Sequence, residues 1–191
     1  RVVDTVESKD NINKAYNLIS TSKVRNEMIV DDVITCITRK QTPVILTRFK
    51  EHAKFLYDAL KGKADHVFLL YGDNSDKENT EIRGRLKQVP GSESLVLVAT
   101  GQKIGEGFDF PRLDVLMLAA PVSFEGRLEQ YVGRLNRDYV GKEAVYVYDY
   151  IDSHVRYFDK MYAKRLRTYR KTGFSIWTQE SQPKQLVNAI D

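Results

Sequence analysis

The stretch LVLVATGQKIGEGFDFP, residues 95–111, decides the fold class of this chain. It starts with an aliphatic run that is continuous rather than alternating, which is typical of a strand buried on both faces of a parallel sheet. The run passes directly into a loop with three glycines within seven residues, and glycine allows positive φ and close backbone approach. In doubly wound α/β folds, ligands bind in the crevice at the carboxyl ends of the strands, where such loops lie.

Similar apolar runs flank this strand on both sides, and they are VIL (44–46), VFLLY (67–71), VLML (115–118) and AVYVY (144–148). Segments of helix length lie between most of them. Residues 49–60 carry an apolar stripe at helical spacing, and residues 75–88 form a polar helix that ends before Pro90 and Gly91. This alternation predicts an α/β fold, a doubly wound and mainly parallel sheet flanked by helices.

Two flanks extend this pattern. Residues 10–39 have apolar side chains at helical spacing, and residues 154–172 predict a long basic helix that ends at Gly173 as a C-cap. The cations of this second helix form either a solvated end favoured by the helix dipole or a surface that contacts phosphates; they are Lys164, Arg165, Arg167, Arg170 and Lys171. The expected organisation is a helical lead-in (1–40), a central α/β domain (41–152) and a basic C-terminal helix and tail (153–191).

Composition sets the limits on function. The chain has 191 residues, 42% of them hydrophobic, with a net charge of +4 and a pI of about 9.0, which permits nucleic acid as a partner. A single cysteine, Cys36, excludes a disulfide framework, so we expect an intracellular protein, cytoplasmic or, in a eukaryote, nuclear. No apolar run is long enough to span a membrane, and no signal peptide is visible. The first residue is Arg1 rather than Met, and we expect a piece of a longer protein.

A second decisive stretch is EQYVGRLNRDYVG, residues 129–141. If residues 124–137 are one helix, its apolar face is Leu128, Tyr131, Val132 and Leu135. Gln130, Arg134 and Arg137 then lie in one line on the opposite face, and Gly133 leaves room beside them. Guanidinium groups are always charged and match phosphate oxygens bidentately, so the line suits a polyphosphate. The face pattern alone fits a surface helix with scattered charges equally well.

The glycine-rich loop offers groups of the same kind. Thr100 and nearby backbone N–H groups are placed to hold a phosphate, and Asp109 is placed to accept a hydrogen bond from a sugar hydroxyl. Taken alone, the loop is equally explained as a tight structural crossover.

Together these segments resemble a known family. TPVILTRFKEHAKFLYDAL (42–60), VATGQKIGEGFDFP (98–111) and QYVGRLNR (130–137) occur in the order and rough spacing of motifs IV, V and VI of the second, C-terminal RecA-like domain of superfamily-2 helicases and translocases. The resemblance covers roughly residues 23–152. It is closer to the excision-repair and restriction-enzyme type than to the DEAD-box type, which usually has His where this chain has Gln130.

The resemblance implies roles for individual residues. Arg134 and Arg137 would reach the γ-phosphate of an ATP held on the other RecA-like domain, Arg137 as the arginine finger. Gln130 and Gly133 would lie beside the nucleotide, with Asp109 near the ribose. The loop residues Gly105, Glu106 and Gly107 would couple the nucleotide to the strand-end crevice. The nucleic-acid backbone would contact Thr47, Arg48, Thr100 and Gly101.

Important parts of an ATPase are missing from the sequence. There is no G-x-x-x-x-G-K-[ST] loop and no Asp-Glu pair, so ATP and Mg²⁺ would be bound mainly by the first motor domain. The three histidines and the cysteine show no metal-ligand spacing, and we expect no metal site. The isolated chain is therefore expected to be inactive.

The sequence thus predicts the second motor domain of an ATP-dependent nucleic-acid helicase or translocase. Its partners would be the N-terminal RecA-like domain of the same parent chain and a nucleic acid, DNA rather than RNA, but no membrane. One alternative is a non-catalytic nucleic-acid binding module with a RecA-like fold, against which the intact Q-x-x-G-R-x-x-R stands. The other is a self-contained nucleotide or phosphate-sugar enzyme, but no glycine loop follows the first strand.

Overall fold

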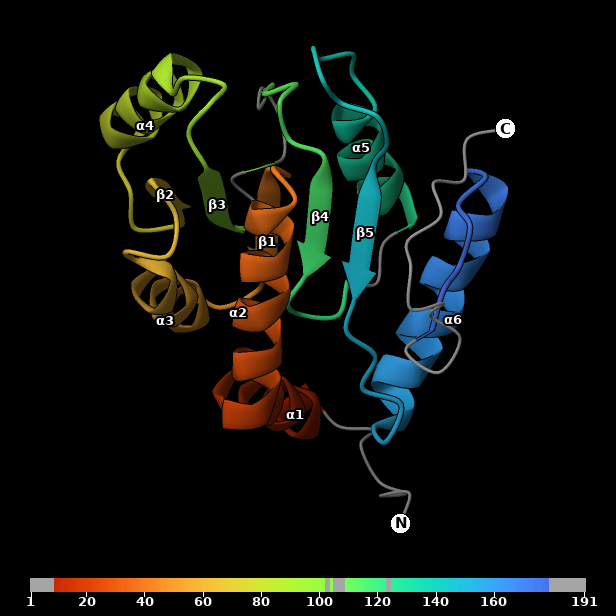
Figure 1. The fold of residues 1–191 in the computed structure, drawn as a ribbon. Helices are drawn as coiled ribbons and strands as arrows, with labels where there is room; N and C mark the ends of the chain where they lie inside the picture. The colour runs from red at the N-terminus through yellow and green to blue at the C-terminus, as the bar shows by residue number, and fades with distance from the viewer. Residues whose placement is uncertain (1–8, 102–103, 105–108, 123–124, 179–191) are drawn as a thin grey trace.

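A computed structural model describes residues 9–101, 104, 109–122 and 125–178, apart from the side chains of 9–10 and 125–128 (Figure 1). A five-stranded sheet forms its centre, in the order β2-β3-β1-β4-β5, and every neighbouring pair is parallel. The strands are β1 (Pro43–Thr47), β2 (His66–Leu70), β3 (Leu95–Thr100), β4 (Val115–Leu118) and β5 (Tyr146–Asp149). The predicted parallel sheet is confirmed.

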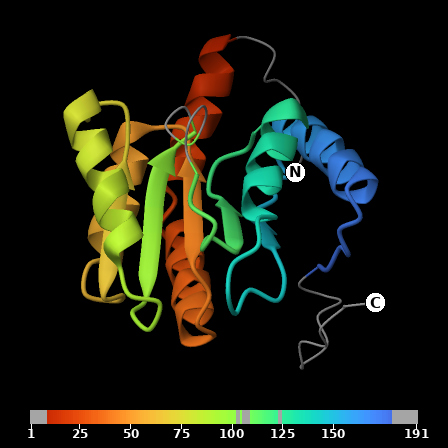
Figure 2. The same cartoon turned by 90° about the horizontal axis from the view of Figure 1, so that it is seen from above.

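Helices cover both faces of this sheet (Figures 1 and 2). They are α1 (Lys9–Thr21), α2 (Lys23–Thr38), α3 (Lys50–Leu60), α4 (Asp76–Gln88), α5 (Glu125–Leu135) and α6 (Arg156–Lys171). Helices α2 and α3 pack on one face, against Ile45 and Met117, whereas α4 and α5 pack on the other, against Leu46 and Leu118. This arrangement is the predicted doubly wound fold.

The central strands are apolar without alternation because both of their faces are covered. All residues of β1, β3 and β4 are buried. Within β1, Val44 and Leu46 belong to the cluster under α4 and α5, while Ile45 belongs to the cluster under α2 and α3. The period-2 geometry of a strand thus supplies two cores from one apolar run.

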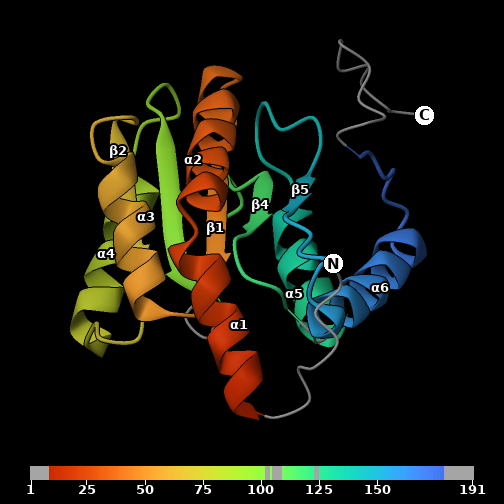
Figure 3. The ribbon, with the colours of Figure 1, turned by 90° about the horizontal axis from the view of Figure 1, so that it is seen from below.

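A third, smaller core lies where the strands end. Tyr16 and Ile19 of α1 pack there against Phe158 and Met161 of α6, with Phe49 beside them. The Tyr16 ring meets the Phe158 ring edge to face at 4.7 Å and the Phe49 ring at 6.0 Å. Figure 3 views the molecule from this end, with α1 in front of the strand ends. Both flanking segments therefore pack on the α/β core.

Some predicted boundaries differ in the structure. The predicted helical lead-in consists of two helices, because Ser22 interrupts it and caps α2, accepting a hydrogen bond from the Arg25 N–H at 3.4 Å. Helix α5 ends at Leu135, so Arg137 lies in the bend that follows and not on the helix. Gly173, with φ of 80°, follows the end of α6 as predicted.

No helix within the described residues is long and apolar enough to cross a bilayer.

Candidate nucleotide and nucleic-acid site

The ends of β1 and β3 bring together the residues predicted to contact nucleic acid. Thr47 and Thr100 are partners in the parallel register, and the N–H of Gly101 donates to the Thr47 carbonyl at 3.3 Å. Arg48 follows Thr47 and is exposed. The four residues are therefore neighbours at the carboxyl edge of the sheet, where ligands of open α/β sheets bind.

The hydroxyl of Thr47 faces inward and not toward solvent. Thr47 is buried, and its Oγ1 lies 2.7 Å from Nδ1 of His52, whose Nε2 lies 2.9 Å from Oδ1 of Asn26. The Asn26 amide nitrogen donates to the Ser20 carbonyl at 2.9 Å, which turns its oxygen toward His52. Nε2 therefore carries the proton of the imidazole, and Nδ1 accepts from the Thr47 hydroxyl.

Burial keeps this histidine neutral. Desolvation, with a smaller effect from the positive charge of Arg25, lowers the pKa of His52 from 6.5 to about 4. Thr47, His52 and Asn26 thus form a neutral hydrogen-bonded network that joins the end of β1 to α2 and α3.

Arg48 rests on the aromatic cluster at the strand ends. Its guanidinium lies 4.6 Å from the centroid of the Tyr16 ring and 6.0 Å from that of Phe49. Cation–π contact of this kind orients a guanidinium while leaving its N–H groups available to an anion. Helix α1 therefore sets the direction of the residue most suited to a phosphate contact at this edge.

The predicted nucleotide residues gather around α5. The Tyr131 hydroxyl donates to the Gly101 carbonyl at 2.7 Å, and Nη1 of Arg134 donates to the Ile104 carbonyl at 3.3 Å. Nη1 of Arg137 lies 2.9 Å from Oδ2 of Asp109, with about half of each side chain exposed. Three side chains of this region thus contact the segment after β3. The predicted residues Gly105, Glu106 and Gly107 lie outside the described residues.

The face assignment of α5 is confirmed where the structure describes it. Tyr131, Val132 and Leu135 are buried, whereas Gln130 and Gly133 are exposed. A Cβ added at Gly133 would meet no atom within 4 Å, so space is open beside the polar face.

Lys142 is a residue of this site that the sequence did not single out. Its ammonium donates to the carbonyls of Pro111 at 2.9 Å, Leu113 at 2.7 Å and Arg137 at 3.1 Å, and also to that of Leu135. Burial lowers the pKa of Lys142. One cation therefore ties the end of α5 and the finger candidate to the exit of the glycine-rich loop. Gly141, at φ of 83°, turns the chain just before it.

The segment that enters α5 is held by side chains from three helices. Ala119, Pro121 and Val122 accept hydrogen bonds through their carbonyls, from Arg25 at 2.6 Å, Tyr16 at 3.1 Å and Arg165 at 3.0 Å. Both arginines are buried and form ion pairs with carboxylates at and after the end of β5, Arg25 with Asp152 and Arg165 with Asp149. Side chains of three helices therefore hold the described segment that precedes α5, and Lys142 holds the residues at the end of α5.

This geometry corrects one expectation. Arg165 was expected among cations that are either solvated or in contact with phosphate, and it is neither. It is 3% exposed, and its guanidinium donates to both oxygens of Asp149, at 2.7 and 2.9 Å. The physical reason is its place on the helix: Arg165 faces the same side as the buried Phe158 and Met161.

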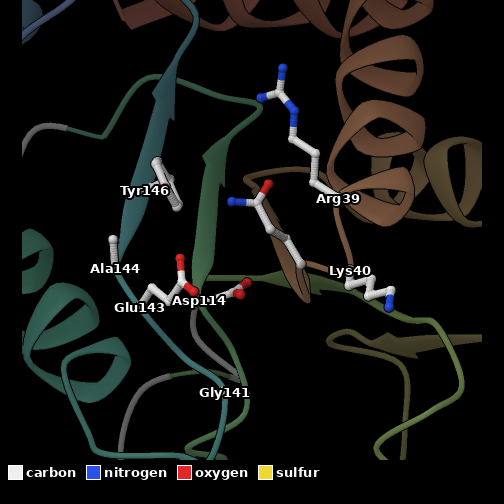
Figure 4. Close-up of a pocket in the computed structure, with 8 residues that line it drawn as sticks. Arg39, Lys40, Asp114, Gly141, Glu143, Ala144 and Tyr146 are labelled. Carbon is white, nitrogen blue, oxygen red and sulfur yellow. The ribbon is translucent and has the colours of Figure 1, made fainter. Parts of the chain in front are cut away.

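A polar pocket of about 410 Å³ lies at the opposite edge of the sheet (Figure 4). It is next to the first residues of β1, β4 and β5, and it contains both basic and acidic side chains. Its lining is Arg39, Lys40, Gln41, Asp114, Gly141, Glu143, Ala144 and Tyr146. None of the predicted site residues lines it.

Several curated viral proteins are similar in sequence, and two of them are described here, while no family model matches the chain. The chain is 29% identical over 120 residues, 62% of its length, to transcript termination protein A18 of Yaba-like disease virus, of which it covers 24%. It is 30% identical over 162 residues, 81% of its length, to putative helicase 161L of invertebrate iridescent virus 6, of which it covers 35%. The chain thus spans about a quarter to a third of the length of these relatives.

Solved structures share the fold. T4 UvsW matches over 91% of this chain and 36% of its own, with a TM-score of 0.69 and 21% identity. The SWI2/SNF2 ATPase core of Sulfolobus solfataricus, in complex with dsDNA, matches over 86% and 37%, with a TM-score of 0.61 and 14% identity. Domain 2 of the DEAD-box helicase Mss116p, bound to an RNA duplex, matches over 70% and 49%, with a TM-score of 0.51 and 22% identity.

The fold and the order of its motifs define a class of protein domain. The chain has the RecA-like fold of a helicase motor domain, and its resemblance to the C-terminal RecA-like domain of superfamily-2 helicases is confirmed.

Proposed function

We propose that this chain is the second motor domain of an ATP-dependent nucleic-acid helicase or translocase, and that it supplies the arginine finger and part of the nucleic-acid contact. The observation that carries the proposal is the gathering of Arg134, Arg137 and Asp109 around the segment after β3. Two guanidiniums at the edge of a RecA-like sheet suit a triphosphate presented by a facing domain.

Arg137 is the finger in this proposal. It is half exposed, and its partner Asp109 is an exposed carboxylate. A surface ion pair of this kind contributes only about 0–1 kcal/mol, so a bound triphosphate can displace Asp109 at small cost. Asp109 is then released toward the ribose. Arg134, held at the Ile104 carbonyl, stays beside the loop and is the second phosphate contact.

The nucleotide itself would be ATP with Mg²⁺, bound mainly by the N-terminal RecA-like domain of the same parent. In the part of the chain that the structure describes, no group of three or more His, Cys, Asp or Glu side chains is arranged to hold a metal. In this proposal the present chain contacts the side of the nucleotide that the N-terminal domain leaves exposed. The further contacts proposed there are Gln130, Gly133 and the loop residues Gly105, Glu106 and Gly107. ATP supplies the transferable phosphoryl group, and these residues orient it and stabilise its charge.

The nucleic acid would pass over the ends of β1 and β3. Arg48 supplies the exposed cation, and Thr100, Gly101 and the backbone at Thr47 supply close approach. DNA is the proposed track; among the structural neighbours, the SWI2/SNF2 core is in complex with dsDNA and Mss116p domain 2 is bound to an RNA duplex. The proposed setting is intracellular.

The test is the substitution Arg137→Ala in the full-length protein. Loss of an arginine finger should lower kcat by roughly 10³ or more while ATP binding to the first domain is kept. Arg137→Lys should not restore turnover, because an ammonium lacks the planar fork of donors. Near-normal turnover of the alanine variant would contradict the role of Arg137, and Arg134→Ala is the next variant to measure.

A further inference from the structure

Helix α6 exposes a row of cations along its outer side. Arg156, Lys160, Lys164, Arg167 and Lys171 are all exposed, and their spacings of four, four, three and four residues place them on one face. We call these five residues the basic face of α6. At a rise of 1.5 Å per residue the row is about 22 Å long, with about 6 Å between cations four residues apart.

The opposite side of α6 fixes this row in place. Phe158, Met161 and Thr168 are buried, and Arg165 is locked to Asp149. Tyr169 adds a hydrogen bond to the same carboxylate at 2.9 Å. The helix thus lies along the β5 side of the molecule (Figure 1) as a rigid support for the cations.

Arg167 has an interaction partner of its own, and acidic groups lie at two further places on or beside the row in the part of the chain that the structure describes. Asp159 is the acidic residue of α6 itself, and Lys171 is paired with Glu129 of α5 at 3.0 Å. An exposed pair of that kind contributes about 0–1 kcal/mol and is easily exchanged for another anion. The basic face therefore keeps an excess of positive charge in a chain whose net charge is only +4.

The row starts beside the proposed nucleic-acid contact. The Arg48 guanidinium lies 4.6 Å from the Tyr16 ring, and the Tyr16 ring lies 4.7 Å from that of Phe158, which is in the first turn of α6. Arg156 and Lys160 flank Phe158 in the sequence. The first turn of α6 therefore packs on the same aromatic cluster that Arg48 contacts, and the first cations of the basic face lie on the outer side of that turn.

We propose that the basic face of α6 is a second binding surface for the sugar–phosphate backbone of the nucleic acid that Arg48 contacts. This inference rests on the proposed function, because that function supplies the nucleic acid. A regular row of cations several turns long fits a polymer with regularly repeated negative charge. Ammonium and guanidinium groups in such a row contact phosphates rather than base edges, so this surface binds largely without regard to sequence.

The experiment compares two double variants of this chain that change the charge equally. Lys160→Gln with Lys164→Gln removes two cations of the basic face. Lys63→Gln with Lys87→Gln removes two exposed lysines after α3 and at the end of α4. Binding of an oligo(dT) of about 20 nucleotides, longer than common single-strand sites, is followed by fluorescence anisotropy between about 50 and 200 mM salt.

The basic-face variant should bind roughly ten-fold more weakly at the lowest salt, and its plot of log K against log [salt] should be flatter by about 1.4, the value for two phosphates of a single strand. The control variant should match the wild type. Equal behaviour of the two variants would overturn the proposal. The proposal would also be overturned if vesicles of anionic phospholipid bound as tightly as the oligonucleotide and this binding depended on Lys160 and Lys164. The basic face would then bind anions in general.

A third variant separates this inference from the proposed function. Arg48→Gln weakens binding if the strand-end edge contacts nucleic acid. If Arg48→Gln weakens binding and the basic-face variant does not, the inference fails while the proposed contact at β1 stands. If the wild-type chain binds no oligonucleotide, both the inference and the nucleic-acid part of the proposed function are overturned, whereas the Arg137 experiment still tests the motor.

Discussion

At the scale of single residues, Lys142 shows how a half-buried charge can organise a surface site. Its three N–H donors are shared among four carbonyls, two from the exit of the glycine-rich loop and two from the end of α5. Removing an ammonium partly from water is costly unless it is hydrogen-bonded, and here the carbonyls accept its hydrogen bonds. The geometry makes Lys142 a positioning residue for Arg137, whose own carbonyl it holds.

Replacing Lys142 by Met should therefore destabilise the chain. The methionine fills the volume but leaves part-buried carbonyls without their donor, and the loss of such hydrogen bonds to a charged group costs about 1–3 kcal/mol. The free energy of unfolding from urea denaturation is the measurement. Lys63→Met, at an exposed position, is the matched control and should change stability by less than about 0.5 kcal/mol. Equal stability of both variants would show that the four contacts are not formed in solution.

The neutral His52 predicts a pH dependence. Its pKa in the folded state is about 4 and its ordinary value is 6.5, so between these values the unfolded chain binds more protons than the folded one. The free energy of unfolding must then rise with pH across this window. The stability that the neutral His52 contributes is present above pH 6.5 and is lost as the pH falls from 6.5 to 4. The full effect is roughly 2–4 kcal/mol.

Denaturation of the wild type and of His52→Gln at a series of pH values isolates this effect. The variant should lose the part of the slope that His52 contributes, while His154→Gln, an exposed histidine, should keep the wild-type slope. Parallel curves for wild type and His52→Gln over pH 4 to 6.5 would mean that His52 takes up its proton in the folded state.

The residue scale also shows what the sequence could not predict. Arg134, Arg137 and Asp109 stood out because their types and spacing suit phosphate and sugar groups. Lys142 did not, because its partners are backbone carbonyls, which leave no mark in the sequence. Likewise, the sequence alone does not distinguish the exposed cations of the basic face of α6 from the buried Arg165. They differ because Arg165 lies on the side of α6 that packs against Asp149.

At the scale of elements, α5 and the segment after β3 act as one unit. The link is the Tyr131 hydroxyl, which donates to the Gly101 carbonyl at 2.7 Å. A Cβ added at Gly101 would lie 3.1 Å from that hydroxyl, so the two residues are in close contact. A shift of the strand end that is proposed to contact nucleic acid would therefore be transmitted to the helix that carries Arg134.

The substitution Tyr131→Phe tests this link. It removes the hydrogen bond to the Gly101 carbonyl and keeps the buried ring, so the free energy of unfolding should fall by about 1 kcal/mol. Tyr139→Phe, at a residue that is 42% exposed, serves as the control and should be close to neutral. Calorimetric or urea unfolding measures both. A neutral Tyr131→Phe would show that the helix and the strand end are not joined through this hydroxyl.

A helix or strand could be predicted from the sequence where the spacing of its apolar residues fitted only one type of secondary structure. The continuous apolar runs predicted the strands, since burial on both faces leaves no polar side, and α3 and α4 were predicted within a residue or two of their ends. The break at Ser22 was missed because the apolar spacing continues across it, and a cap depends on one hydroxyl. The end of α5 at Leu135 was missed for a similar reason: the line of Arg134 and Arg137 fits a longer helix.

At the scale of the whole molecule, the proposed function gives the chain half of a catalytic site. Its described residues present cations to an edge of the sheet, and its sequence has neither a phosphate-binding loop nor an Asp-Glu pair. The chain matches only 24% and 35% of the lengths of its viral relatives. Catalysis that depends on two facing domains couples hydrolysis to their closure, which is how a motor of this architecture would convert ATP into movement.

The isolated chain should therefore hydrolyse no ATP, with or without nucleic acid. Arginines alone neither bind the β-phosphate nor position Mg²⁺ and water, so the main contributions to phosphoryl transfer are absent. Phosphate release by the purified chain is the measurement, and the same preparation carrying Arg137→Ala is the control for contaminating ATPases. Turnover that depends on Arg137 in this chain alone would mean that the catalytic site is complete here, and the two-domain proposal would have to be abandoned. No turnover in either preparation, together with an Arg137-dependent kcat in the full-length protein, is the pattern that a finger acting across a domain interface requires.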